Sequence, residues 1–210
     1  MNIPCQICEK RRARRFCPGA GGEICPGCCG AGRENTIDCP STCDYLLEAR
    51  AHERPIAVAE NEIPNRDIRV TEEFLEQHGP LVVWLTSALA EAMGSRKAVD
   101  RDAGEALETL IKTYRTLQSG LIYETRPQNP YAAAIHERLK ASIEDLSKSI
   151  AERSGLHTLR DADVLGVLVF LQRLQIGHNN GRPRGRMFYD FLRQSLPGPE
   201  KGADQAIVRI

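Results

Sequence analysis

The sequence predicts a mainly α-helical protein with a small cysteine-rich module at its N-terminus, followed by an antiparallel bundle of about five helices. Two observations predict this fold class. All eight cysteines lie within the first 43 of the 210 residues, and beyond residue 71 apolar side chains recur at helical spacing. We therefore expect four regions: the module at 1–54, a linker or strap at 55–70, the bundle at 71–196 and a tail at 197–210.

The composition is that of an ordinary globular chain, with 41% hydrophobic and 27% charged residues. Lys plus Arg and Asp plus Glu both number 28, so the formal net charge is zero. A neutral chain is not a general polyanion binder, and any nucleic-acid site must be a local patch.

The sequence shows no secretory or membrane-spanning signal. The N-terminus lacks an apolar run of signal-peptide type. The longest dense apolar stretch, Val164 to Leu171, contains Gly166 and falls far short of the roughly 20 residues that span a bilayer. We expect a soluble cytoplasmic protein without membrane contact, a compartment where cysteines serve metals more often than disulfides.

The cysteine spacing indicates structural zinc. Cys5-x2-Cys8 and Cys25-x2-Cys28 place thiolates in tight turns, the second of which contains Pro26 and Gly27. A tetrahedral ion with Zn–S bonds near 2.3 Å requires such turns. Eight thiolates suffice for two closed zinc sites, and such short segments need the metal for folding. The predicted ligands are Cys5, Cys8, Cys17, Cys25, Cys28, Cys29, Cys39 and Cys43.

Two partitions of these ligands are open. Neighbours in extended chain point in opposite directions, so Cys28 and Cys29 should serve different ions. The preferred, interleaved partition places Cys5, Cys8, Cys25 and Cys28 on one ion and Cys17, Cys29, Cys39 and Cys43 on the other. A sequential partition would group Cys5, Cys8, Cys17 and Cys25, with Cys28, Cys29, Cys39 and Cys43 on the second ion. His52 is a possible substitute ligand in the second site.

The stretches Cys5-Gln-Ile-Cys8, Phe16-Cys17-Pro18 and Ile24-Cys25-Pro-Gly-Cys28-Cys29 resemble the cross-brace zinc fingers of the HIT and MYND type. Ala20 stands where those families place a further cysteine. The resemblance implies a protein-interaction module and covers about a quarter of the chain.

A broader resemblance is to uncharacterised bacterial proteins that join a cysteine-rich zinc module to an α-helical domain. It is carried by Cys39-Pro-Ser-Thr-Cys43-Asp-Tyr-Leu and by the run from Asn179 to Arg186. This group implies no activity.

Helical periodicity and capping residues define the elements of the bundle. Ala103, Leu107, Leu110, Tyr114 and Leu117 form one stripe, with Asp100 as the expected cap. Asn129 before Pro130 predicts another helix start, Asp161 or Asp163 should cap the next helix, and Leu81–Leu85, including Trp84, should be central. The expected helices are 44–54 in the module and 72–77, 80–93, 100–119, 130–153, 161–176 and 184–196 beyond it.

Two arginine clusters are candidate anion or nucleic-acid contacts. The first follows Lys10 and comprises Arg11, Arg12, Arg14 and Arg15; the second comprises Arg182, Arg184 and Arg186. Arginine forks recognise phosphates. The competing interpretation is charge balance, since each Zn(Cys)4 site carries about −2, or pairing of the second cluster with acidic residues.

No phosphate-binding, dinucleotide-binding or hydrolase motif occurs in the chain, so we expect no catalytic residues and no organic cofactor. The leading hypothesis is a zinc-stabilised protein-interaction adaptor whose partner is another protein. The alternative is a nucleic-acid binder that uses the arginine clusters. A third hypothesis, an enzyme, requires Glu124, Arg126 and His178 to converge. The sequence does not specify an oligomeric state.

Overall fold

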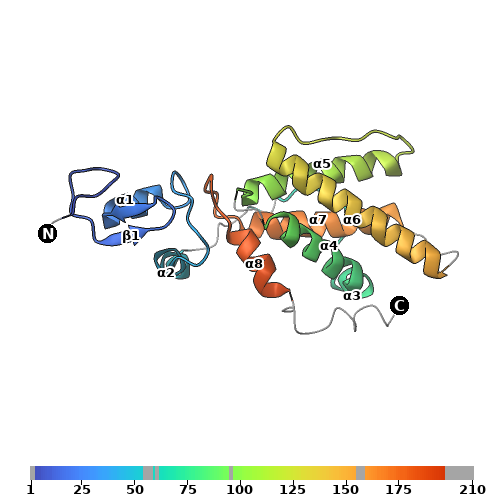
Figure 1. Cartoon of the computed structure of the whole chain (residues 1–210). Helices are drawn as coiled ribbons and strands as arrows, with labels where there is room; N and C mark the ends of the chain where they lie inside the picture. The colour runs from blue at the N-terminus through green and yellow to red at the C-terminus, as the bar shows by residue number, and fades with distance from the viewer. Residues whose placement is uncertain (1–2, 54–58, 60–61, 95–96, 155–158, 197–210) are drawn as a thin grey trace.

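The computed structural model describes residues 3–53, 59, 62–94, 97–154 and 159–196, and the ribbon forms two parts (Figure 1). The N-terminal part contains β1 (Arg15–Cys17), β2 (Gly22–Ile24), α1 (Pro26–Gly32) and α2 (Asp44–His52). The second part contains α3 (Glu72–Gln77), α4 (Gly79–Ala92), α5 (Asp100–Gln118), α6 (Pro130–Ser154), α7 (Asp161–His178) and α8 (Met187–Ser195).

The mainly helical class is confirmed, but the expected helix count is wrong. The described residues contain eight helices, six of them after residue 71, so a bundle of about five is too low a count. Each of the six segments expected beyond residue 71 does form a helix, whereas α1 is not among the expected helices. The predicted tail at 197–210 and parts of the predicted linker, 55–58 and 60–61, lie outside the described residues. None of the helices in the described ranges is both long and apolar enough to cross a lipid bilayer.

The N-terminal part is built from very short elements. β1 and β2 pair antiparallel, with Arg15 opposite Ile24, and α1 has only seven residues. Its small core consists mostly of cysteines, joined by Ile24 and Ile37. Such a core buries little apolar area, so the hydrophobic effect stabilises this part only weakly.

The second part has one apolar core, in which α5 packs against α7 while α4 and α6 lie alongside. The predicted stripe on α5 is confirmed at Ala103, Leu107 and Leu110, which are all buried. α8 adds Phe188 and Leu192 to the same core.

Trp84 does not occupy the centre of this core as expected. It is 40% exposed, and Val83 beside it is 45% exposed. The indole Nε1–H donates to the backbone oxygen of Ser142 at 3.1 Å. An indole N–H needs a partner when it is covered, and this requirement places the ring at the α4–α6 edge.

Helix capping differs from prediction at Asp100. Val99, not Asp100, is the N-cap of α5, and Asp102 accepts the backbone N–H of Val99 at 2.9 Å. The Asp100 carboxylate instead accepts the N–H groups of Phe188 and Tyr189, at 2.9 and 3.1 Å. It therefore satisfies backbone donors in the first turn of α8.

The starts of α6 and α7 differ in their agreement with the prediction. Asn129 accepts the N–H of Tyr131 at 2.9 Å, as predicted for a cap of α6. In contrast, Arg160 is the N-cap of α7, so Asp161 lies one position inside the helix.

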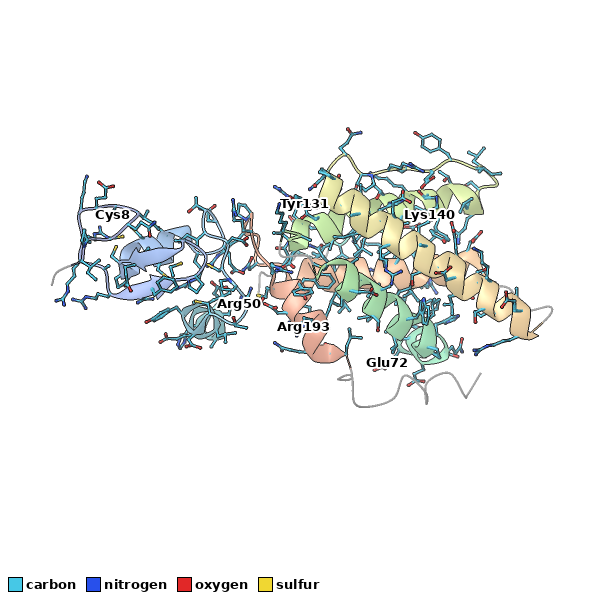
Figure 2. All side chains as sticks on the ribbon, in the orientation of Figure 1. Cys8, Arg50, Glu72, Tyr131, Lys140 and Arg193 are labelled. Carbon is cyan, nitrogen blue, oxygen red and sulfur yellow. The ribbon has the colours of Figure 1, made fainter. Side chains whose placement is uncertain are left out.

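The junction between the two parts centres on Glu34, which is 1% exposed. Its carboxylate accepts from Arg50 at 2.5 Å and from Asn180 at 2.8 Å, and its backbone oxygen accepts the N–H of Arg184 at 2.8 Å. Arg50, on α2 at this boundary (Figure 2), also bonds Asp190 of α8. Because residues 182–186 serve this junction, α8 starts at Met187 and not at 184.

Candidate metal centre

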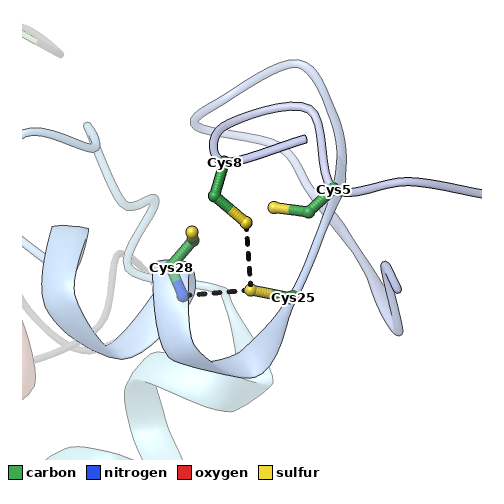
Figure 3. Close-up of side chains that lie close together, drawn as sticks. All are labelled: Cys5, Cys8, Cys25 and Cys28. Carbon is green, nitrogen blue, oxygen red and sulfur yellow. Dashed lines mark hydrogen bonds between the residues drawn. The ribbon is translucent and has the colours of Figure 1, made fainter. Parts of the chain in front are cut away.

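Four cysteines from two segments converge in the N-terminal part (Figure 3). Cys5 and Cys8 lie in the first loop, while Cys25 is the N-cap of α1 and Cys28 lies in its first turn. Their sulfur atoms all lie within 4.8 Å of one another, and the Sγ atoms of Cys8 and Cys25 are 4.0 Å apart. Four sulfurs around a tetrahedral zinc would be about 3.8 Å apart, so this group fits a metal ion.

Backbone geometry prepares the group for thiolates. The N–H of Cys28 donates to Cys25 Sγ at 3.4 Å. Burial raises the pKa of the Cys5 thiol, but hydrogen bonds from the backbone of Cys8, Cys25 and Ile7 outweigh it and lower the pKa to about 6. The backbone N–H groups of Lys10 and Arg11 lower the pKa of Cys8 in the same way.

Mutual repulsion acts on the fourth sulfur. Its contact with Cys25, followed by burial, raises the pKa of Cys28 to about 12. Four thiolates in one place therefore need a cation, and a divalent metal supplies one.

The other four cysteines lie around a second, smaller space. Cys17, Cys29, Cys39 and Cys43 all line one cavity of about 10 Å³, together with Tyr45 and Leu46. That volume holds about one water-sized sphere. Burial raises the pKa of Cys39, with further contributions from Cys17 and Cys43, which is consistent with their proximity.

The first group matches the interleaved partition and not the sequential one, which would place Cys17 with Cys5, Cys8 and Cys25. Among the described residues, Cys17, Cys29, Cys39 and Cys43 form no group of three or more sulfurs within 4.8 Å of one another, so the structure brings only the first set together. Cys28 lies with Cys5, Cys8 and Cys25, whereas its neighbour Cys29 lines the second cavity. His52 is exposed at the end of α2 and belongs to neither set in the described chain.

One of the predicted arginines contacts a cysteine sulfur, and another covers a turn that carries two of the cysteines. A Cβ on Gly27 would collide with the guanidinium of Arg11, which therefore covers the turn between Cys25 and Cys28. Arg15 donates to Cys29 Sγ at 3.7 Å and stacks over Tyr45, 3.8 Å from the ring centroid. Both placements support charge balance at the cysteine groups.

The second arginine cluster is largely occupied within the chain. Arg182 pairs with Glu53 at 2.5 Å and with Glu34 at 3.5 Å. Arg186 is 9% exposed and donates to the backbone oxygen of Met93. Arg184 keeps an exposed side chain.

Of the three residues of the enzyme hypothesis, Glu124 and Arg126 pair with each other, whereas the ring contact of His178 is with Phe191. Glu124 pairs with Lys140 at 2.9 Å and with Arg126 at 3.1 Å. The hydrogen bond from Lys140, and to a smaller extent that from Arg126, lowers the pKa of Glu124 to about 2. His178 instead stacks on Phe191 of α8, with the ring centroids 3.6 Å apart.

Two features of the structure are missing from the sequence-based prediction. Buried His136 lies 3.6 Å from Glu124, and with Glu137 they form a second group of potential metal ligands, although Lys140 and Arg126 already neutralise Glu124. Glu34 is the other. Nothing in its sequence context distinguishes it from a surface glutamate, except its position between Cys29 and Cys39.

Comparison of the chain with family models, curated proteins and solved structures found no match. The class of protein therefore rests on the geometry alone: a mainly helical chain with a four-cysteine group that could hold a metal ion.

Proposed function

We propose that this protein is a zinc-stabilised adaptor whose N-terminal module holds two structural zinc ions and presents a surface to another protein. The convergence of the Cys5, Cys8, Cys25 and Cys28 sulfurs carries this proposal. A complete thiolate shell leaves no open coordination position, which favours a structural over a catalytic ion.

The second ion would be held by Cys17, Cys29, Cys39 and Cys43. Their shared cavity and the Arg15 donor at Cys29 Sγ support this assignment, since an N–H bond to sulfur stabilises a thiolate ligand. A tetrahedral set of thiolates suits zinc or an iron–sulfur cluster. Zinc is favoured because the close C-x2-C-x2-C run of ferredoxins is absent from the sequence.

Adjacent cysteines provide a sharp test. Native mass spectrometry should find two zinc ions on the full chain and one on each of Cys28→Ser and Cys29→Ser. The double variant should retain none or bind only weakly, because each site then has three thiolates. If the double variant still held one zinc ion, Cys28 and Cys29 would serve the same site, and the proposal would be contradicted. A chain that contains iron and shows a visible charge-transfer band would contradict it as well.

The module also exposes apolar side chains that an adaptor would use. Phe16 is 58% exposed, Ile3 53% and Ile7 49%. Buried aromatic anchors dominate binding energy at protein interfaces. Pull-down with Phe16→Asp should lose a partner that Leu47→Asp, a matched change on α2, retains. Equal recovery with both variants would remove Phe16 from the interface.

Nucleic-acid binding is the second candidate, supported only by the first cluster. Lys10, Arg12 and Arg14 are exposed and form none of the ion pairs found among described residues. Three phosphate contacts on a single strand predict a slope of about −2 in log K against log salt. Arg12→Ala should flatten that slope, whereas Arg193→Ala on α8 should not; absence of binding at low salt would exclude this candidate.

A further inference from the structure

A cleft of about 620 Å³ opens on the bundle, far along the chain from the cysteines. Its walls come from α5, α7 and the segment 62–65. This volume lies within the range of small-molecule sites, which combine a concave surface with a few fixed polar groups. Two such groups, Gln172 and Gln175 of α7, line the cleft and are only 6% and 5% exposed.

The hydrogen bonds determine which end of the Gln172 amide is free. Arg115 donates to Asn65 Oδ1 from Nε at 3.1 Å and from Nη2 at 2.8 Å. A guanidinium only donates, so the other end of the Asn65 amide is its NH2 group. This group donates to Gln172 Oε1 at 2.7 Å, which leaves the Nε2 donor of Gln172 for the cleft.

Gln175 presents an acceptor to the cleft, where Gln172 presents a donor. Its Nε2 donates to the backbone oxygen of Asp100 at 3.0 Å. Because a carbonyl oxygen only accepts, this end of the Gln175 amide is the NH2 group, and Oε1 is the end that remains for the cleft. Among the described residues no hydrogen bond to Gln175 Oε1 or from Gln172 Nε2 occurs, and neither atom is sealed from solvent. Gly104 of α5 faces this oxygen, and a Cβ there would lie 3.2 Å from it.

The surroundings hold both amides in place before any ligand arrives. Asn65 has φ +56°, a conformation that asparagine tolerates better than most residues. Its backbone oxygen accepts from Arg173 at 2.8 Å, and Arg115 is itself fixed by Asp67. Side chains fixed in this way lose little entropy on binding, which favours affinity.

We propose that this cleft binds a small molecule with an amide-type edge, an acceptor beside an N–H donor, such as a nucleobase or a carboxamide. The ligand acceptor would receive the Gln172 Nε2–H, and the ligand N–H would donate to Gln175 Oε1. Residues one turn apart on a helix lie on the same face, so one planar ligand reaches both. This site is independent of the zinc module and of the adaptor function.

Four probes test the proposal on the zinc-loaded full chain by saturation-transfer NMR and calorimetry. Uracil and nicotinamide carry the required edge, while 1,3-dimethyluracil and N,N-dimethylnicotinamide lack the N–H donor. We expect at least one of the first pair to bind about tenfold or more tightly than its methylated analogue, because the analogue leaves Gln175 Oε1 unpaired. Uracil binding alone would indicate a nucleobase, and nicotinamide binding alone an open carboxamide.

Variants place the binding in the cleft. Gln172→Glu retains the acceptor for Asn65 but replaces the free donor with an acceptor, and Gln175→Leu removes the free acceptor. Each should weaken binding about tenfold, while Gln77→Leu on exposed α3 should leave it unchanged. If Gln175→Leu does not fold, Gln172→Glu decides. Failure of both parent probes to bind at millimolar concentration, or binding that withstands the cleft variants, would overturn the proposal.

Discussion

Asp100 joins the first turns of two helices through a single buried carboxylate. It is 1% exposed and accepts two backbone N–H groups of α8. Burial raises the pKa of Asp100 from 3.8 to about 7, although those N–H groups oppose the shift. A raised carboxyl pKa stabilises the fold fully below the unfolded value and loses that contribution as the pH rises through about 7.

Asp100→Asn should remove this pH dependence, since asparagine stays neutral and still accepts one N–H. The free energy of unfolding of the natural chain, relative to Asp100→Asn, should therefore decrease between about pH 5 and pH 7 and level off above that. Urea titrations at both pH values, in constant zinc, measure it. Parallel behaviour of the two proteins would show that Asp100 does not titrate in this range.

At the scale of elements, α7 contains two glycines in opposite environments. A Cβ on Gly166 would collide with the ring of Phe74 on α3, whereas a Cβ on Gly177 would have no neighbour within 4 Å. Close packing of α3 on α7 thus depends on Gly166, while Gly177 only lowers helix propensity.

The two glycines form a matched pair of substitutions. Gly166→Ala should destabilise the chain by about 1 kcal/mol or more, because overpacking outweighs the gain in propensity. Gly177→Ala should stabilise it by about 0.5–1 kcal/mol. Chemical denaturation followed by circular dichroism distinguishes them; stabilisation by both substitutions would mean that Phe74 moves aside without cost.

The elements of the N-terminal part differ from those of the bundle in what stabilises them. β1 and β2 have three residues each, whereas α5 and α7 share an extensive apolar core. Removal of the proposed zinc should therefore abolish amide-exchange protection in residues 3–43 and leave α5 and α7 protected. Persistent protection of β1 and β2 after chelation would argue against a metal-dependent module.

At the scale of the whole molecule, Glu34 connects the two parts. It lies in the loop between Cys29 and Cys39, and it binds Arg50, Asn180 and Arg182. Metal binding would fix this loop and thereby position the carboxylate at the bundle.

Glu34→Gln should lower the free energy of unfolding by about 3–5 kcal/mol, because removal of one partner of a buried ion pair leaves the other charge uncompensated. Glu48→Gln, an exposed change on α2, should cost less than about 0.5 kcal/mol. Denaturant titration measures the cost, and faster amide exchange in residues 179–186 would locate it at the junction. Equal stability of the two variants would show that the junction does not depend on this charge.

Periodic and local signals in the sequence predict much of this architecture. Cysteine spacing and the opposed directions of Cys28 and Cys29 predict the grouping seen at Cys5, Cys8, Cys25 and Cys28. The apolar stripe of α5 predicts its buried face, because both signals depend on neighbours within a few residues.

Contacts between distant segments are beyond such signals. Asp100 looks like the cap of its own helix but serves α8, 88 residues away in the chain. Trp84 has an apolar local context, yet its N–H partner on α6 draws it to an edge. The free amide ends at Gln172 and Gln175 emerge only when the bonds of Asn65 and Asp100 are known.

The position of α8 in the chain has a consequence for biosynthesis. Phe188 and Leu192 complete a core built with α4, α5 and α7, and the N–H groups at the start of α8 are the partners of the buried Asp100 carboxylate. Every other bundle helix leaves the ribosome earlier. Until α8 emerges, the nascent bundle therefore exposes the apolar surface that α8 covers, and the Asp100 carboxylate lacks its two N–H donors. Chaperones that recognise exposed apolar surface should therefore engage this chain late in translation and release it once α8 docks.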